Sequence, residues 1–208
     1  METRLLAIRH GATEWNHTGR FQGRSDVPLS DEGRAQARAL AAALRREPLR
    51  RVIASDLSRA YETARIVAEP HGLPVETDAR LREFDFGAWE GLRWDEIVER
   101  FPELQDRART EAVLYAPSGG ERFDDVVERV RAFVRDFPRE AGSITVVTHA
   151  GVLHALFAVL GLHAPDGRPL RFSPGSLTTI ALGERSSGEP ARLILFDHVP
   201  ARDSTDLA

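Results

Sequence analysis

The chain has 208 residues, a net charge of −4, 42% hydrophobic residues and 29% charged residues, a balance typical of a globular protein with one sizeable core. The negative charge predicts no general attraction to nucleic acid or to an anionic membrane, so any anion site must be local. The 28 basic residues are all Arg and the chain has no Cys, which excludes lysine Schiff bases, disulfides and thiolate catalysis.

The first half of the chain predicts alternating strands and helices. Residues 5–8 are an apolar run that ends at Arg9-His10-Gly11, as a short buried strand followed by a turn would. Ser30 is a candidate N-cap for an Ala-rich helix that extends to about residue 46. Residues 51–54 predict a second strand, and residues 55–69 predict a second helix. This alternation indicates a parallel α/β sheet.

The second half continues the pattern after an irregular stretch. Between residues 81 and 120 aromatic side chains stand among charges and Pro-Gly breaks, which we interpret as a helical lid insertion (about residues 87–120) within a single domain of residues 1–208. An amphipathic helix, a buried strand, an apolar helix and two further strands are then predicted at residues 123–137, 143–148, 150–161, 177–182 and 193–196. The predicted fold is a three-layer α/β/α sandwich with a mostly parallel sheet and a loop tail from residue 197.

The short apolar stretch at the N-terminus matches neither a secretory signal nor a membrane span. We therefore expect a cytoplasmic protein.

Polar residues follow three of the predicted strands where each strand ends: Arg9-His10-Gly11, Ser55 to Arg59, and Thr148 to Gly151. In open parallel sheets, ligands bind in the crevice outside the carboxyl ends of the strands, so two His and two Arg can converge there. Because neighbouring strand residues point to opposite faces, Arg9 and His10 can both reach the site only if the strand has already turned at Gly11.

Two Arg beside two His are typical of an anion site. Guanidinium groups match phosphate oxygens in pairs of hydrogen bonds, and their fixed charge opposes a divalent cation. The spacing of His149 and His154, five residues apart, does not fit a His-Glu-x-x-His zinc motif. We expect no metal and no cofactor.

The sequence resembles the histidine phosphatase superfamily, in its phosphoglycerate mutase-like branch. The resemblance rests on ordered blocks across most of the chain: residues 9–16 (Arg-His-Gly-Ala-Thr-Glu-Trp-Asn), 55–60 with 63–64, 81–83 with 86–91, 119–121, and 148–151. It implies that His10 is the nucleophile that becomes phosphohistidine. A neutral imidazole can attack only if its other nitrogen keeps a proton, and we expect the carbonyl that accepts this proton to lie near Gly11.

The resemblance also assigns the other site residues. Arg9, Arg59 and His149 would grip the phosphate oxygens, aided by backbone N–H groups of Ala150 or Gly151 at a helix start. Side chains of Asn16 and Gln22 could donate further hydrogen bonds. Glu83 matches the acid that protonates the leaving group, although an ordinary ion pair with Arg80 or Arg82 is an alternative. Asp85 is a weaker competitor for the same role.

Three activities are compatible with this resemblance: a phosphatase, a cofactor-dependent phosphoglycerate mutase, and a non-catalytic module that binds phosphorylated ligands. Mutases of the family typically follow the catalytic Glu with Arg-x-Tyr-Gly, whereas residues 84–87 here are Phe-Asp-Phe-Gly. A binding module would not need both His10 and Glu83. We therefore predict a metal-independent phosphomonoester hydrolase.

The partner of this enzyme is predicted to be a small phosphorylated metabolite. Aromatic side chains are expected to line the substrate end of the pocket, with Trp89 and Trp94 better explained as lid core: Phe21, Phe84, Phe86, Trp89, Trp94 and Tyr115. His154 is expected to be a packing residue. The sequence leaves open the substrate (α-ribazole phosphate, phosphoserine, a sugar phosphate or several), residual mutase activity, homodimer formation and the role of the tail.

Overall fold

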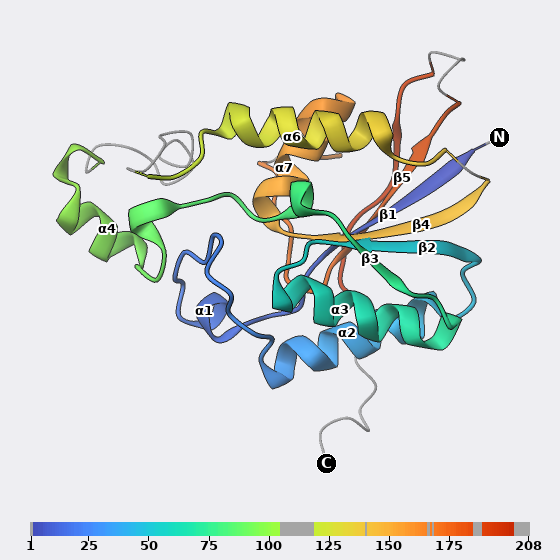
Figure 1. Cartoon of the computed structure of the whole chain (residues 1–208), viewed down its shortest axis with the longest axis horizontal. Helices are drawn as coiled ribbons and strands as arrows, with labels where there is room; N and C mark the ends of the chain where they lie inside the picture. The colour runs from blue at the N-terminus through green and yellow to red at the C-terminus, as the bar shows by residue number, and fades with distance from the viewer. Residues whose placement is uncertain are drawn as a thin grey trace.

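The computed structural model describes residues 2–104, 119–139, 141–165, 167, 169–184 and 189–201, and Figure 1 shows their arrangement. The central sheet has six strands in the order β3-β2-β4-β1-β5-β6. Their bounds are β1 Thr3–Arg9, β2 Leu49–Ala54, β3 Val75–Thr77, β4 Gly142–Thr148, β5 Leu177–Leu182 and β6 Arg192–His198. Strands β3, β2, β4 and β1 are parallel, whereas β5 pairs antiparallel with β1 and β6 pairs antiparallel with β5.

The helices lie on both faces of this sheet and in the lid. The α-helices are α1 Glu14–His17, α2 Asp31–Leu44, α3 Ser58–Ala68, α4 Trp94–Arg100, α6 Phe123–Asp136 and α7 Ala150–Leu160. Short 3₁₀ turns occupy Glu69–His71, Ala79–Leu81, Gly87–Trp89 and Pro102–Leu104. None of the helices in the described ranges is long and apolar enough to cross a membrane.

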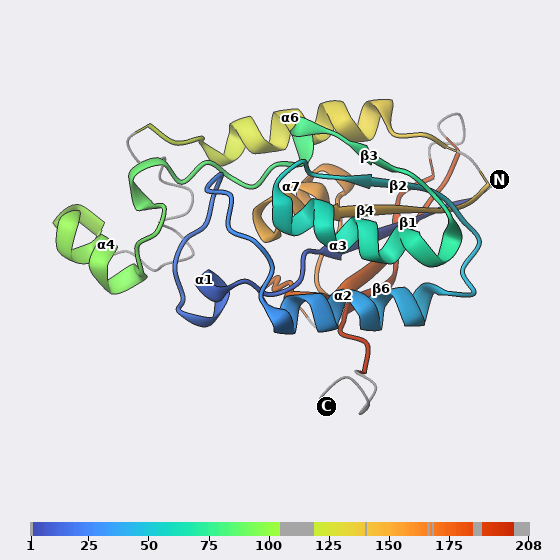
Figure 2. The same cartoon turned by 60° about the horizontal axis from the view of Figure 1, so that its bottom comes forward.

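Strand β1 shows why the sheet carries two helical layers. Its side chains alternate between two hydrophobic clusters, because successive strand residues point to opposite faces. Leu5 and Ala7 pack with helices α6 and α7, whereas Leu6 and Ile8 pack with α2 and α3. Figure 2 shows α2 and α3 on one side of the sheet and α6 on the other. The predicted three-layer sandwich is therefore confirmed.

Most predicted elements are present, with differences at their ends. Helix α3 begins at Ser58, with Leu57 in extended conformation as its N-cap, so Ser55 and Asp56 belong to the loop after β2. Strand β6 continues to His198, into the tail that was expected to be a loop. Helix α1 and strand β3 were not predicted, because four and three residues are too few to show a hydrophobic period.

The described part of the lid has its own small core. Phe21, Trp89, Ile97 and Leu104 are buried together at the end of the molecule that carries α4, so Trp89 is a lid core residue, as expected. Residues 105–118, including Tyr115, lie outside the described part of the chain, and the lid limits near 87 and 120 stay a prediction.

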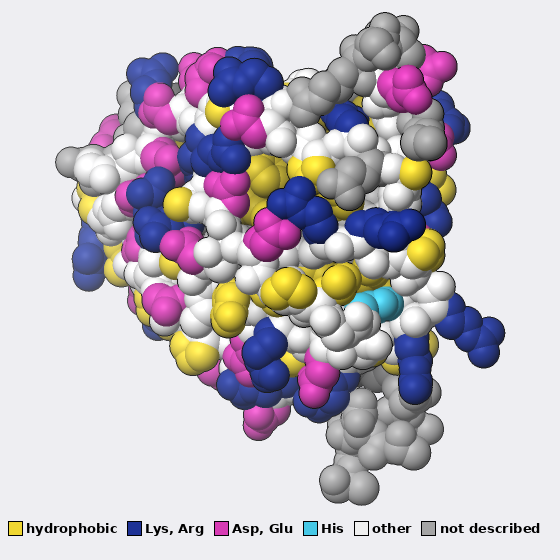
Figure 3. All heavy atoms as spheres, turned by 45° about the vertical axis from the view of Figure 1, so that its right-hand side comes forward, with side chains coloured by type: hydrophobic (Ala, Val, Ile, Leu, Met, Phe, Trp, Pro, Cys, Tyr) yellow, Lys and Arg dark blue, Asp and Glu magenta, His cyan; other side chains and the backbone are white. Residues whose placement is uncertain are grey.

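On the face shown in Figure 3, Arg and acidic side chains are interspersed.

Candidate active site

A cavity of about 640 Å³ opens at the carboxyl ends of β1 and β4 and the N-terminus of α7. Its wall includes ten residues expected in the site: Arg9, His10, Asn16, Phe21, Gln22, Arg59, Glu83, Phe86, Ala150 and Gly151. The strand ends therefore bring together residues that are up to about 140 positions apart in the sequence, as the crevice rule for parallel sheets predicts.

His10 is buried directly after β1, and its ring is oriented by its own loop. Nδ1 lies 2.7 Å from the carbonyl oxygen of Gly11. Because a carbonyl only accepts, Nδ1 carries the proton and Nε2 keeps its lone pair. Burial, and then the charges of Arg59 and Arg9, lower the pKa of His10 well below its usual value. The acceptor expected near Gly11 is thus the Gly11 carbonyl, and the ring is a neutral nucleophile near pH 7.

Both site arginines are held by backbone carbonyls. The two terminal nitrogens of Arg59 donate to the carbonyl oxygens of Ser25 (2.8 Å) and Gly23 (2.7 Å). One terminal nitrogen of Arg9 donates to the carbonyl of Phe172 at 2.5 Å. Both Nε atoms are buried without a hydrogen-bond partner. Buried cationic donors that lack a partner indicate a place for an anion.

His149 is fully buried and is not among the residues that line the cavity, and its ring centroid lies 5.0 Å from that of His10. Its Nε2 is 2.9 Å from the Ser55 hydroxyl, which itself accepts the N–H of Leu57 at 3.3 Å. In the tautomer with the ring proton on Nδ1, the Ser55 hydroxyl donates to Nε2. That Nδ1 is buried without a partner. Burial, followed by the charge of Arg59, lowers the pKa of His149 well below its usual value.

Glu83 lies in the cavity wall and is held by backbone N–H groups. Its Oε1 accepts hydrogen bonds from the N–H of Phe84 (2.8 Å) and of Gly151 (3.1 Å). A Cβ on Gly151 would lie 2.5 Å from Oε1 of Glu83, so only glycine allows this approach. The N–H of Gly151, expected to bind phosphate, is instead engaged with the carboxylate of Glu83.

The alternative ion pairs proposed for Glu83 are not formed. Arg80 pairs with Asp78 and Asp136, and Arg82 pairs with Asp56. The competing acid Asp85 accepts the N–H of Gly87 at 2.9 Å, and it is not among the cavity-lining residues of the described chain.

Asn16 and Gln22 reach the cavity from the loop after His10. The Oδ1 atom of Asn16 accepts the backbone N–H of Thr13 at 3.0 Å, in the capping box that begins α1, so its amide NH₂ group is the part left for a ligand. Oε1 of Gln22 is buried without a partner, and a turn of this amide would present its NH₂ group at the same point.

The aromatic residues divide between the cavity and the core. Phe21 and Phe86 line the cavity. Phe84, which was expected beside them, is fully buried in the core and stacks under Phe86 with ring centroids 4.9 Å apart. The expectation that Phe84 contacts substrate is therefore corrected: its side chain points to the opposite face from that of Glu83.

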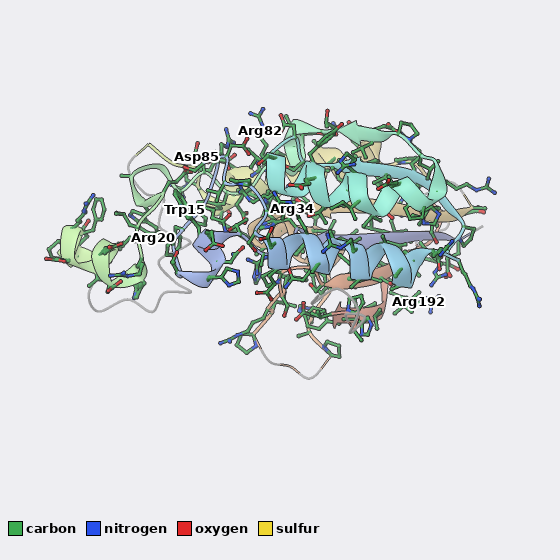
Figure 4. The ribbon with its side chains drawn as sticks, turned by 90° about the horizontal axis from the view of Figure 1, so that it is seen from below. Trp15, Arg20, Arg34, Arg82, Asp85 and Arg192 are labelled. Atoms are coloured by element: carbon green, nitrogen blue, oxygen red, sulfur yellow. The ribbon has the colours of Figure 1, made fainter. Side chains whose placement is uncertain are left out.

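Part of the cavity wall was missed by sequence reasoning: Arg20, His154 and residues 170–174. His154, expected to be packing, both lines the cavity and packs edge-on against Phe172, with ring centroids 5.2 Å apart. The loop of residues 170–174 precedes an antiparallel strand, so the rule for strand ends does not point to it. Arg20 is labelled in Figure 4 at the lid end of the molecule.

The described ranges contain no cluster of three or more His, Asp or Glu side chains that could hold a metal ion. What the site concentrates instead is a neutral imidazole, buried cationic donors and one acid, which together are suited to phosphoryl transfer by positioning and charge.

The chain belongs to the histidine phosphatase superfamily (branch 1), whose family model matches residues 5–189. The membership predicted from the Arg9-His10-Gly11 and Thr148–Gly151 blocks is thus confirmed.

Several relatives of the chain are named as phosphatases. The chain is 37% identical over 199 residues to glucosyl-3-phosphoglycerate phosphatase of Mycolicibacterium vanbaalenii, covering 90% of this chain and 88% of that protein. It is 35% identical over 159 residues to phosphoserine phosphatase 1 of Hydrogenobacter thermophilus, covering 76% and 75%. A solved structure of mycobacterial glucosyl-3-phosphoglycerate phosphatase with VO₃ superposes with a TM-score of 0.78 at 34% identity, covering 93% and 98%. This chain is a phosphatase-type member of the family, and the mutase alternative is not favoured.

Proposed function

We propose that this protein hydrolyses small phosphomonoesters through a phosphohistidine formed on Nε2 of His10. The observation that carries the proposal is a neutral, buried His10, with Nδ1 held by Gly11, beside arginine and histidine nitrogens that are buried without partners. A phosphoryl group at this place would satisfy those donors, and its transfer requires mainly positioning and charge stabilisation.

The reaction has two steps. Nε2 of His10 attacks phosphorus while the bond to the ester oxygen breaks, and Glu83 in its protonated form gives its proton to that oxygen, which leaves as an alcohol. Glu83, now a carboxylate, then takes a proton from a water molecule as this water attacks the phosphohistidine. Inorganic phosphate leaves, and both His10 and Glu83 return to their starting forms.

Arg9, Arg59 and His149 are proposed to bind the non-bridging oxygens, with Asn16, Gln22 and the N–H of Ala150 as neutral donors. Phe21 and Phe86 also line the cavity, as do Arg20 and the exposed Arg171. The named relatives act on a phosphorylated glycerate derivative and on phosphoserine, both of which carry a carboxylate. We therefore favour phosphorylated metabolites with an acidic group as substrates. A cytoplasmic location stays a prediction, and homodimer formation stays an open point of the sequence.

The test is release of inorganic phosphate in excess chelator from a panel of phosphomonoesters, namely 3-phosphoglycerate, phosphoserine, sugar phosphates, nucleotides and an aryl phosphate. We expect release that survives the chelator and is abolished in His10→Ala, with the circular dichroism spectrum of the variant unchanged. Activity in His10→Ala equal to wild type would contradict the mechanism. Absence of release from all substrates would turn attention to mutase activity primed with 2,3-bisphosphoglycerate.

A further inference from the structure

Glu90 lies in the lid, and its carboxylate contacts the loop of residues 22–25 beside the cavity. Oε1 accepts the backbone N–H of Arg24 at 2.8 Å. Oε2 accepts both the N–H and the hydroxyl of Ser25, at 2.9 and 2.6 Å. The N–H of Phe86 adds a longer bond of 3.3 Å to Oε1. One side chain therefore fixes two successive peptide units of this loop, yet it takes no part in the reaction described above.

The same loop supplies the carbonyl groups that hold Arg59. Gly23 and Ser25, the residues on either side of Arg24, each present a carbonyl oxygen to one terminal nitrogen of Arg59. Gly23 has φ +55°, and a Cβ built on it would lie 2.0 Å from Oε1 of Glu90. Glycine is thus required at this position both for the backbone conformation and for the approach of the carboxylate.

The lid segment that carries Glu90 is itself tied to the residue before the loop. The N–H of Gly91 donates to the carbonyl of Phe21 at 2.8 Å, and the N–H of Phe21 donates to the carbonyl of Leu92 at 3.0 Å. Trp89 is buried against Phe21, with ring centroids 5.9 Å apart. Because both neighbours of Glu90 are anchored, its carboxylate is preorganised toward Arg24 and Ser25 instead of being free to turn to solvent.

We propose that Glu90 is the positioning residue for Arg59: it shapes the loop whose Gly23 and Ser25 carbonyls aim the guanidinium at the phosphate. This inference rests on the proposed function, in which Arg59 binds the phosphoryl group. It couples the lid to the phosphate end of the cavity, since a displaced lid would release the loop and with it the guanidinium. A guanidinium without its two carbonyl partners would turn away from the phosphate oxygens.

The experiment measures the affinity for inorganic phosphate by titration calorimetry, because binding requires no turnover. Glu90→Ala removes all four contacts. Glu90→Gln keeps an acceptor oxygen but places an NH₂ group opposite the N–H of Ser25. Glu99→Ala is the matched control, since Glu99 is an exposed lid glutamate outside the cavity wall. Arg59→Lys, alone and combined with Glu90→Ala, keeps a positive charge so that binding stays measurable. Melting temperatures are recorded for every variant.

We expect phosphate affinity to fall about 10- to 100-fold in Glu90→Ala, the scale of a charge-assisted hydrogen bond, by less in Glu90→Gln, and not at all in Glu99→Ala. In the Arg59→Lys background, Glu90→Ala should cost little further affinity, because both changes remove the same interaction.

An equal loss in both backgrounds, or full affinity in a folded Glu90→Ala protein, would overturn the proposal, as would a wild-type protein that binds no phosphate. Wild-type binding without hydrolysis would refute the proposed function while leaving the role of Glu90 in place.

Discussion

Among the described residues, Glu83 is the carboxylate that lines the cavity, and the N–H groups of Phe84 and Gly151 hold it. Asp85 and Glu121, in contrast, both lie within ion-pair distance of Arg24. The backbone contacts of Glu83 involve mainly Oε1, so Oε2 is the oxygen more available to exchange a proton with a leaving group.

Glu83→Gln should therefore separate substrates by their leaving groups. An alkyl ester needs a proton on its departing oxygen, and general acid catalysis contributes about 10²- to 10⁴-fold, so kcat should fall by that factor. The phenolate of an activated aryl phosphate leaves without being protonated. For this substrate the rate of phosphohistidine formation should fall roughly tenfold or less. Single-turnover rates with both substrates provide the measurement, and equal losses would argue against Glu83 as the acid.

At the scale of secondary-structure elements, the first turn of α7 is packed against the acid. Gly151, in this turn, donates its N–H to Glu83 and brings the helix backbone against the carboxylate. Elsewhere in a helix, replacing Gly by Ala stabilises by roughly 1 kcal/mol. Here the added Cβ would approach Oε1 of Glu83 to 2.5 Å and the Cβ of Phe84 to 3.4 Å, so the carboxylate must move.

Gly151→Ala is thus expected to separate activity from stability. The gain in helix propensity offsets much of the local strain, so the melting temperature should change little. Displacement of Glu83 should lower kcat for an alkyl phosphomonoester about tenfold or more, with a smaller effect on an aryl phosphate. A variant with unchanged alkyl phosphatase activity would show that the position of Glu83 is not critical.

Residues of this site could be predicted from the sequence where a motif or the end of a predicted strand marked them. His10 could be placed because its motif and its strand-end position agreed, whereas Glu83 was placed by its motif alone. The loop of residues 170–174 could not be predicted as part of the cavity wall, because it has no motif and precedes an antiparallel strand. Phe84 was wrongly predicted to contact substrate, because the sequence pattern around it does not show that its side chain is buried in the core. The role of Glu90 depends on contacts across about 65 positions, which no local pattern reveals.

At the scale of the whole molecule, the site is a source of instability in acid. His10 and His149 are buried with neighbouring arginine charges, and the pKa of each lies well below 6.5 in the folded protein. The pKa of the partly buried His154 is also lowered, mainly by burial. In the unfolded chain these rings take up protons as the pH falls below about 6.5. Protonation therefore favours the unfolded state, and the stability present above pH 6.5 is lost as the pH falls toward the lowered values.

The free energy of unfolding should accordingly decrease between pH 6.5 and 5.5 by about 1 kcal/mol for each histidine that stays neutral in the folded protein. Carboxylates paired with arginine, such as Asp78 and Asp136, have lowered pKa values, and so they contribute only below this window. Urea unfolding at pH 7.5, 6.5 and 5.5 measures the slope. The double variant His10→Asn/His149→Asn should flatten it, whereas His163→Gln, at an exposed position, should not. An unchanged slope in the double variant would mean that the two histidines do not titrate differently on folding. The low pKa that keeps His10 nucleophilic in mild acid is thus expected to reduce the stability of the fold under the same conditions.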